Sequence, residues 1–115
     1  MAETASPGEL LTQEESRIIS ACLLAAEEGP FFPDWEFQTL FGVERPVLRN
    51  VRLHWADVSL SDEAVRASVF NSLAHLLAYP HGEQKSLLGY VPEGRNKIRD
   101  ILIILSNLEL PRDAP

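Results

Sequence analysis

Cysteine is almost absent from this sequence: Cys22 is the only one, so no disulfide bond within the chain is possible. Long apolar runs are absent too. The longest, residues 101–105 and 21–26, fall far short of the ~20 residues that span a bilayer. The first residues lack the basic segment and apolar run of a secretory leader. From these absences we expect a cytoplasmic protein that does not interact with membranes.

Motifs that would indicate catalysis or a bound cofactor are also lacking. The six glycines are scattered singly and form no phosphate-binding loop. The three histidines, His54, His75 and His81, follow no spacing typical of metal ligands. Consecutive acids such as Asp62 and Glu63 fall at expected helix ends, where they act as caps. We therefore expect neither an enzyme nor a metal or cofactor.

Basic residues are in the minority. Ten Lys and Arg residues stand against 17 Asp and Glu residues, for a net charge of −7 at neutral pH. The acidity is concentrated in residues 1–30, where Arg17 is the only base among six acids. A strongly acidic protein repels nucleic acid and anionic membranes. Nucleic acid is therefore not the expected partner, and a basic protein fits the charge better.

Capping signals and helix-period apolar residues predict an all-α protein. The first half of the chain is expected to hold helices over residues 13–28, 33–41 and 45–54. Thr12 and Glu15 form a capping-box sequence at the start of the first helix, and Gly29 ends it. Proline in the first turn opens each of the next two, because its missing N–H has no helical partner there.

In the second half, Ser61 and the two acids after it cap a helix with Val65, Val69 and Leu73 on one face. A short turn over residues 83–88 and a last helix from Pro92 follow. Leu102 lies on the apolar face of that last helix, and Pro111 ends it.

The predicted helices make one domain. We expect a flexible N-terminal arm over residues 1–10, a single helical domain over 11–110 and a flexible C-terminal tail over 111–115. The fold class is then all-α, a compact bundle of about five short helices joined by short loops.

The segment 34–53 resembles, in spacing, the helix-turn-helix unit that reads DNA. With Gly42 as the turn glycine, apolar residues fall where that unit packs its two helices. The helix over residues 45–54 would be the reading helix, exposing Arg45, Arg49, Asn50 and Arg52. Gln38, Pro46 and the acidic charge depart from the pattern. A DNA-binding regulator is therefore the alternative function.

The preferred function is non-catalytic protein binding. Small acidic helical proteins that neutralise a basic toxin or nuclease, as immunity proteins and antitoxins do, are similar in size, charge and helix content. Three features supply candidate binding residues: the acids of the first helix, the aromatic cluster after it and the last helix. These residues are Glu14, Glu15, Glu27, Glu28, Phe31, Phe32, Trp35, Ile103 and Ile104.

The last helix raises the question of a homodimer. Successive residues on a helix step by 100°, so the unbroken apolar run 101–105 passes all the way round it. Either the helix is enclosed by the others, or Ile103 or Ile104 faces outward and is covered by a second chain. Of these two, the sequence slightly favours the dimer.

Overall fold

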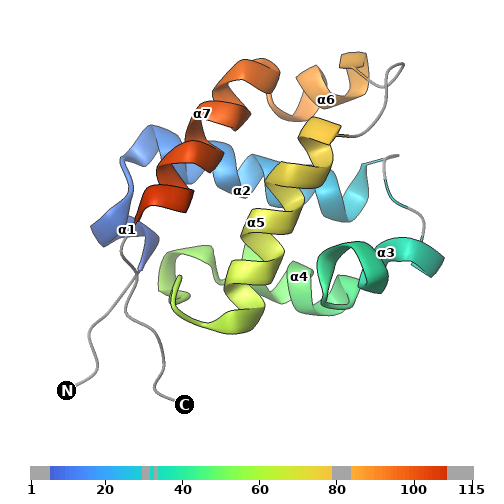
Figure 1. Ribbon diagram of the computed structural model, residues 1–115, viewed down its shortest axis with the longest axis horizontal. Helices are drawn as coiled ribbons and strands as arrows, with labels where there is room; N and C mark the ends of the chain where they lie inside the picture. Colours follow the sequence, from blue (N-terminus) through green and yellow to red (C-terminus); the bar gives the residue numbers. More distant parts are fainter. Residues whose placement is uncertain (1–5, 30–31, 33, 79–83, 109–115) are drawn as a thin grey trace.

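The chain folds into helices joined by short connections (Figure 1). The structure is a computed structural model and describes residues 6–29, 32, 34–78 and 84–108. Its elements are α1 (Pro7–Leu10), α2 (Gln13–Glu28), α3 (Asp34–Phe41), α4 (Arg45–Leu53), the 3₁₀ turn η1 (Trp55–Asp57), α5 (Glu63–Ala78), α6 (Gln84–Tyr90) and α7 (Gly94–Asn107). No strand occurs in these described ranges. The all-α prediction is confirmed.

Helix α2 begins as the sequence predicts. The Thr12 hydroxyl accepts a hydrogen bond from the Glu15 N–H at 3.1 Å, and the Glu15 carboxylate accepts one from the Thr12 N–H at 2.9 Å. A side-chain cap also opens α5, where Asp62, rather than Ser61, accepts hydrogen bonds from the N–H groups of Ala64 and Val65. Capping chemistry therefore fixes where the two longest helices begin.

The expected loose arm over residues 1–10 is wrong for Pro7–Leu10, which form α1. Pro7 occupies the first helical position and is buried, and α1 packs against η1 and α2. An isolated turn of this length is unstable in water, so these contacts hold it. The sequence offers no periodicity over four residues that would reveal it. Residues 1–5 and the predicted tail over 111–115 lie outside the described residues.

Two other boundaries differ from the prediction. Helix α6 runs through Gly89 to Tyr90 instead of ending at residue 88. Helix α7 begins at Gly94, two residues after Pro92, with a Gly94 φ of +83°. That backbone conformation favours glycine, so the chain turns sharply at Gly94 before entering the last helix.

Helices α2 and α5 cross at the centre of the molecule (Figure 1). Helix α5 packs against α2 on one side and is flanked by α7 and by the α3–α4 pair. Large side chains with less than 2 % exposure fill the space between them: Ile18, Ile19, Leu23, Phe37, Phe41, Leu48, Leu60, Val69, Leu73, Ile98, Ile101 and Leu105. One core therefore joins residues from 18 to 105.

The α3–α4 pair is fastened to α5 by side-chain hydrogen bonds. The Asn71 amide donates to the carbonyl of Phe41 at 2.9 Å, and Nε2 of His75 lies 2.7 Å from the carbonyl of Leu40. These carbonyls end α3, just before the turn at Gly42, which has a φ of +72°. The two polar side chains of α5 thus satisfy backbone groups at the end of a short helix.

Cys22 lies at the centre of the core with no exposed surface. Burial raises the pKa of its thiol to about 12, so the thiol stays protonated at neutral pH. Because the thiolate is the reactive form, we expect no reaction with Ellman's reagent at pH 8 in the folded protein. One thiol per chain should react after denaturation in guanidinium. Rapid reaction of the native protein would contradict the burial of this residue.

Candidate interaction surfaces

The acidic end of α2 is neutralised inside the molecule. Glu27, whose side chain is only 4 % exposed, accepts hydrogen bonds at 2.7 Å from Nε of Arg49 and at 2.7 Å from Nε of Arg52. Burial alone would raise the pKa of the Glu27 carboxyl. The hydrogen bonds and charges of the two arginines outweigh burial and hold that pKa below its ordinary value. Glu27 is thus a buried ion-pair partner within this chain.

The arginines of α4 point toward α2. The Arg45 guanidinium donates to the carbonyl oxygens of Glu27 and, at 2.8 Å, of Phe32, and lies 4.3 Å from the centre of the Phe37 ring. It therefore caps the C-terminal end of α2, where helix carbonyls lack helical partners. The alternative helix-turn-helix hypothesis assigns these arginines to base reading. In the structure they hold α4 against α2.

The outward side of α4 is only partly cationic. Arg49 is half exposed at 50 % of its side chain although it pairs with Glu27, and Asn50 is exposed. The most exposed apolar residue of this helix is Leu53, at 62 %. Of the four candidate reading residues, two thus remain accessible. The apolar residues of the helix-turn-helix spacing, Phe37, Phe41, Leu48 and Val51, are all core residues, as both a helix-turn-helix unit and an ordinary pair of packed helices require.

The remaining acids of α2 are also engaged. Glu14 pairs with Lys97 of α7 at 3.0 Å, and Glu15 belongs to the capping box. Glu28 lies 4.0 Å from Arg52 and is the most accessible of those near the C-terminal end, at 54 % of its side chain. The acidic face expected on this helix is therefore largely a set of intramolecular contacts.

The aromatic residues build the core. Phe32 is 4 % exposed and meets the ring of Phe41 edge-on, with centroids 4.9 Å apart. Phe41 stacks on Phe37 at 4.3 Å and also contacts the ring of His75. Phe32 is thus a core residue. Phe31 and the side chain of Trp35, the other two aromatic candidates, lie outside the described residues.

The last helix places two of its four isoleucines at the surface. Ile103 is 53 % exposed and Ile104 is 38 % exposed, whereas Ile101 and Leu105 are buried. Helix α7 is therefore not enclosed, and one side of it meets solvent with apolar side chains. Leu102, predicted on the buried stripe, is only partly buried, because the packing of α7 centres on Ile98, Ile101 and Leu105.

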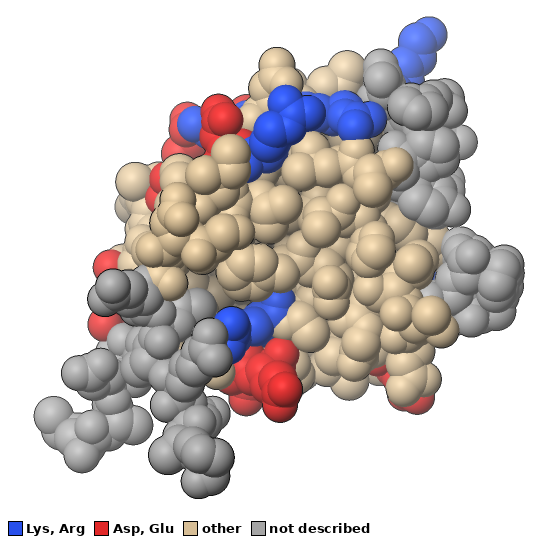
Figure 2. Space-filling view, viewed as in Figure 1, with Lys and Arg blue, Asp and Glu red and all other residues tan. Residues whose placement is uncertain are grey.

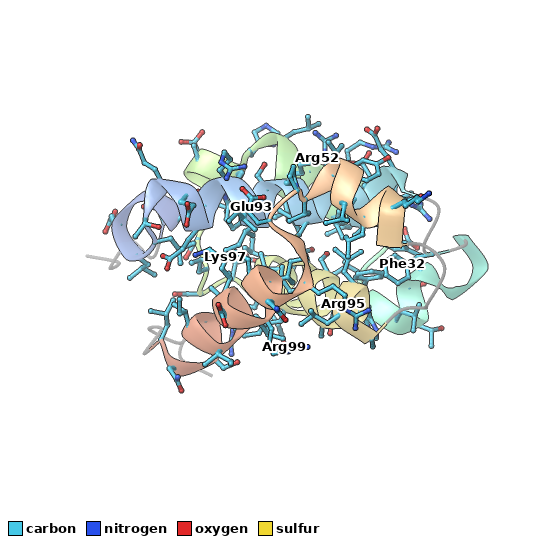
Figure 3. The ribbon with its side chains drawn as sticks, turned by 90° about the horizontal axis from the view of Figure 1, so that it is seen from above. Phe32, Arg52, Glu93, Arg95, Lys97 and Arg99 are labelled. Atoms are coloured by element: carbon cyan, nitrogen blue, oxygen red, sulfur yellow. The ribbon has the colours of Figure 1, made fainter. Side chains whose placement is uncertain are left out.

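A wide uncharged surface extends over α5 and α7 (Figure 2). Figure 3 places Arg99 on the side of α7 turned away from α2, and Lys97 on the side toward α2. Ile103 follows Arg99 by four residues and so lies on the same side of the helix. We call this surface the α5–α7 face and define it by Ala67, Phe70, Ala74, Leu102, Ile103 and Ser106.

A groove of about 690 Å³ follows the opposite flank of α2. Ser16, Ser20, Leu24 and Trp55 are among the residues that line it, and Trp55 donates a hydrogen bond at 2.8 Å to the Ser16 hydroxyl. The sequence did not predict this groove, because α1 and η1, which border it, carry no helical periodicity. Its lining holds no Asp or Glu.

The described part of the chain offers no group of three or more His, Cys, Asp or Glu side chains that is placed to hold a metal ion. None of its helices combines the length and apolar character needed to cross a membrane. The chain matches no protein-family model, no curated protein and no solved structure. Its function must therefore be inferred from these surfaces.

Proposed function

We propose that this protein acts without catalysis, by binding another protein through the α5–α7 face. The observation that carries the proposal is the 53 % exposure of Ile103, together with the wide uncharged surface over α5 and α7 (Figure 2). Interaction sites are marked by contiguous apolar patches with a polar rim. Partly buried Phe70 and Leu102 extend the patch, and aromatic side chains are enriched in the centres of interfaces.

The accessible chemistry also supports binding rather than catalysis. Cys22 is buried and protonated, and His75 is engaged by the carbonyl of Leu40. Glu27, the titratable carboxylate with the least exposed side chain among the described ion pairs, is neutralised by two arginines. Each of these groups is buried or held by contacts within the chain.

Two other modes of binding have less support. A basic partner would meet α2 acids that are already paired, as for Glu14 and Glu27. A DNA duplex would meet a reading helix whose Arg45 and Arg52 are turned toward the C-terminal end of α2. The α5–α7 face needs no such rearrangement before it binds.

Affinity capture with matched variants tests the proposal. Wild-type protein, Ile103→Glu and Leu53→Glu are each immobilised and exposed to an extract of the source cells. Both substitutions place a charge at an exposed apolar site, so their stability should change by no more than about 0.5 kcal/mol. A protein, or further copies of the chain, should be retained by wild type and Leu53→Glu and lost with Ile103→Glu. Equal capture by all three would reject the α5–α7 face.

A further inference from the structure

Two copies of a chain with a net charge of −7 repel one another, so a contact between them needs a surface that is uncharged or has opposite charges in register. The α5–α7 face has both properties. From Ala67 to Ala78, helix α5 carries no Asp, Glu, Lys or Arg. Its outward residues there are small or aromatic: Ala67, Phe70 and Ala74. Small side chains let a second helix approach closely.

The charges of the face lie at its two ends. Glu63 is an exposed acid in the first turn of α5, on the same side of the helix as Ala67 and Phe70. Arg99 of α7 lies toward the other end, near Arg95, which donates to the carbonyl of Leu77 in the last turn of α5 (Figure 3). In Figure 2, basic residues border the upper edge of the uncharged surface, and its lower edge carries acidic residues with a basic side chain beside them. Arg66, four residues before Phe70, lies at the same end of α5 as Glu63.

Glu63 and Arg99 are both available for a new contact. Glu63 makes no ion pair with any other residue that the structure describes. Arg99 donates a hydrogen bond only to the neutral Asn96 side chain, at 3.2 Å, among the contacts within the described ranges. They differ in this from Glu14, Glu27, Arg17 and Lys97, all of which are paired within the chain.

We propose that the partner of the α5–α7 face is a second copy of this chain, in a two-fold symmetric dimer. The two-fold axis lies in the plane of the face and across α5, so the two α5 helices are antiparallel. This rotation places Glu63 of each copy opposite Arg99 of the other and brings Ile103 and Phe70 of both copies into one apolar centre. An isologous contact of this kind closes on itself and leaves no open site for a third copy.

The surface required is modest. A stable dimer buries about 800 Å² per partner, roughly one-eighth of the 6784 Å² of accessible surface of this chain. Helix α5 alone, with 16 residues, is about 24 Å long, and α7 lies beside it. This inference rests on the proposed function, because it assigns a partner to the same face.

Light scattering coupled to gel filtration, over a concentration series, measures the dimer dissociation constant. Arg99→Glu and Glu63→Arg should each raise that constant by about tenfold or more, since each creates two like-charge contacts by symmetry. The double variant, with both substitutions, should recover most of the loss, and so should an equimolar mixture of the two single variants. Lys85→Glu on α6, which packs against α2, makes the same change in net charge as Arg99→Glu and is its control; it should weaken the dimer much less than Arg99→Glu does.

Three outcomes would overturn the proposal: a monomer at every concentration, a dimer that Ile103→Glu leaves intact, or single variants that the charge exchange does not rescue. The first outcome, together with an extract protein lost only with Ile103→Glu, would reject the second copy as partner and keep the proposed function. If the protein is a monomer and Ile103→Glu also leaves capture from the extract unchanged, the α5–α7 face itself is rejected. Reduced helicity by circular dichroism identifies any variant that fails to fold. At such a position Arg99→Gln or Glu63→Gln replaces the charge reversal. Each of these is expected to weaken the dimer less than the charge reversal does.

Discussion

Replacing Leu73 by alanine is expected to lower the free energy of unfolding by about 2–5 kcal/mol. Leu73 has no exposed surface and lies on the central helix α5, which packs against α2, α3, α4 and α7. Truncation removes buried methyl groups and leaves a cavity. The surrounding helices cannot all move in to fill it, because each is held by its other contacts. Denaturant unfolding followed by circular dichroism measures the change, with an unaltered dependence on denaturant as the sign that the fold is retained.

Two further leucines calibrate this result. From the sequence, Leu102→Ala carries the same expected cost as Leu73→Ala, because both lie on apolar stripes. In the structure Leu102 is only partly buried, so we expect a loss of about 1 kcal/mol, well under that of a core leucine. Leu53→Ala, at 62 % exposure, should change stability by no more than about 0.5 kcal/mol. Equal losses at positions 73 and 102 would show that α7 packs differently.

Removing the Glu27 carboxylate is the second large change. In Glu27→Ala, Arg49 and Arg52 lose their buried partner, and we expect a loss of about 2 kcal/mol. The loss should stay below that of a fully buried pair, because half of the Arg49 side chain remains in water. Glu28→Ala is the matched control: its carboxylate is exposed and only 4.0 Å from Arg52, so its effect should be small. A Glu28→Ala loss equal to that of Glu27→Ala would contradict this assignment.

The Glu27 contribution should also depend on pH. The pKa of its carboxyl is lowered in the folded state from an ordinary value of 4.5, so the folded state favours the ionised form. The stabilisation is therefore complete above about pH 5.5 and is lost as the pH falls below 4.5 through the folded pKa. The stability difference between wild type and Glu27→Gln should shrink over that acidic range. A difference that is constant from pH 7 to pH 3 would remove Glu27 from the pH response.

Local sequence chemistry determined the longer helices of this protein. The capping box of Thr12 and Glu15, the helix-period apolar residues of α2 and α5, and the glycine turn at residue 42 act within a few residues of one another. Such interactions are visible in one dimension, because the partners are neighbours in the chain. The burial of Cys22 followed in the same way from its place on an apolar stripe. Local interactions did not decide whether α7 is enclosed by the other helices or turns Ile103 or Ile104 outward, because that depends on contacts with distant parts of the chain.

Contacts between residues distant in the chain were decided only by the tertiary structure. Glu27 meets Arg49 and Arg52 across more than 20 residues, and this contact makes Glu27, one of the expected binding residues, a buried ion-pair partner. Helix α1 exists because it packs on η1, and the outward direction of Ile103 follows from which side of α7 meets α5. Charge and hydropathy describe what a side chain offers. Which side chains are already paired within the chain depends on how the helices pack against one another. That packing is decided by the free energy of the whole core.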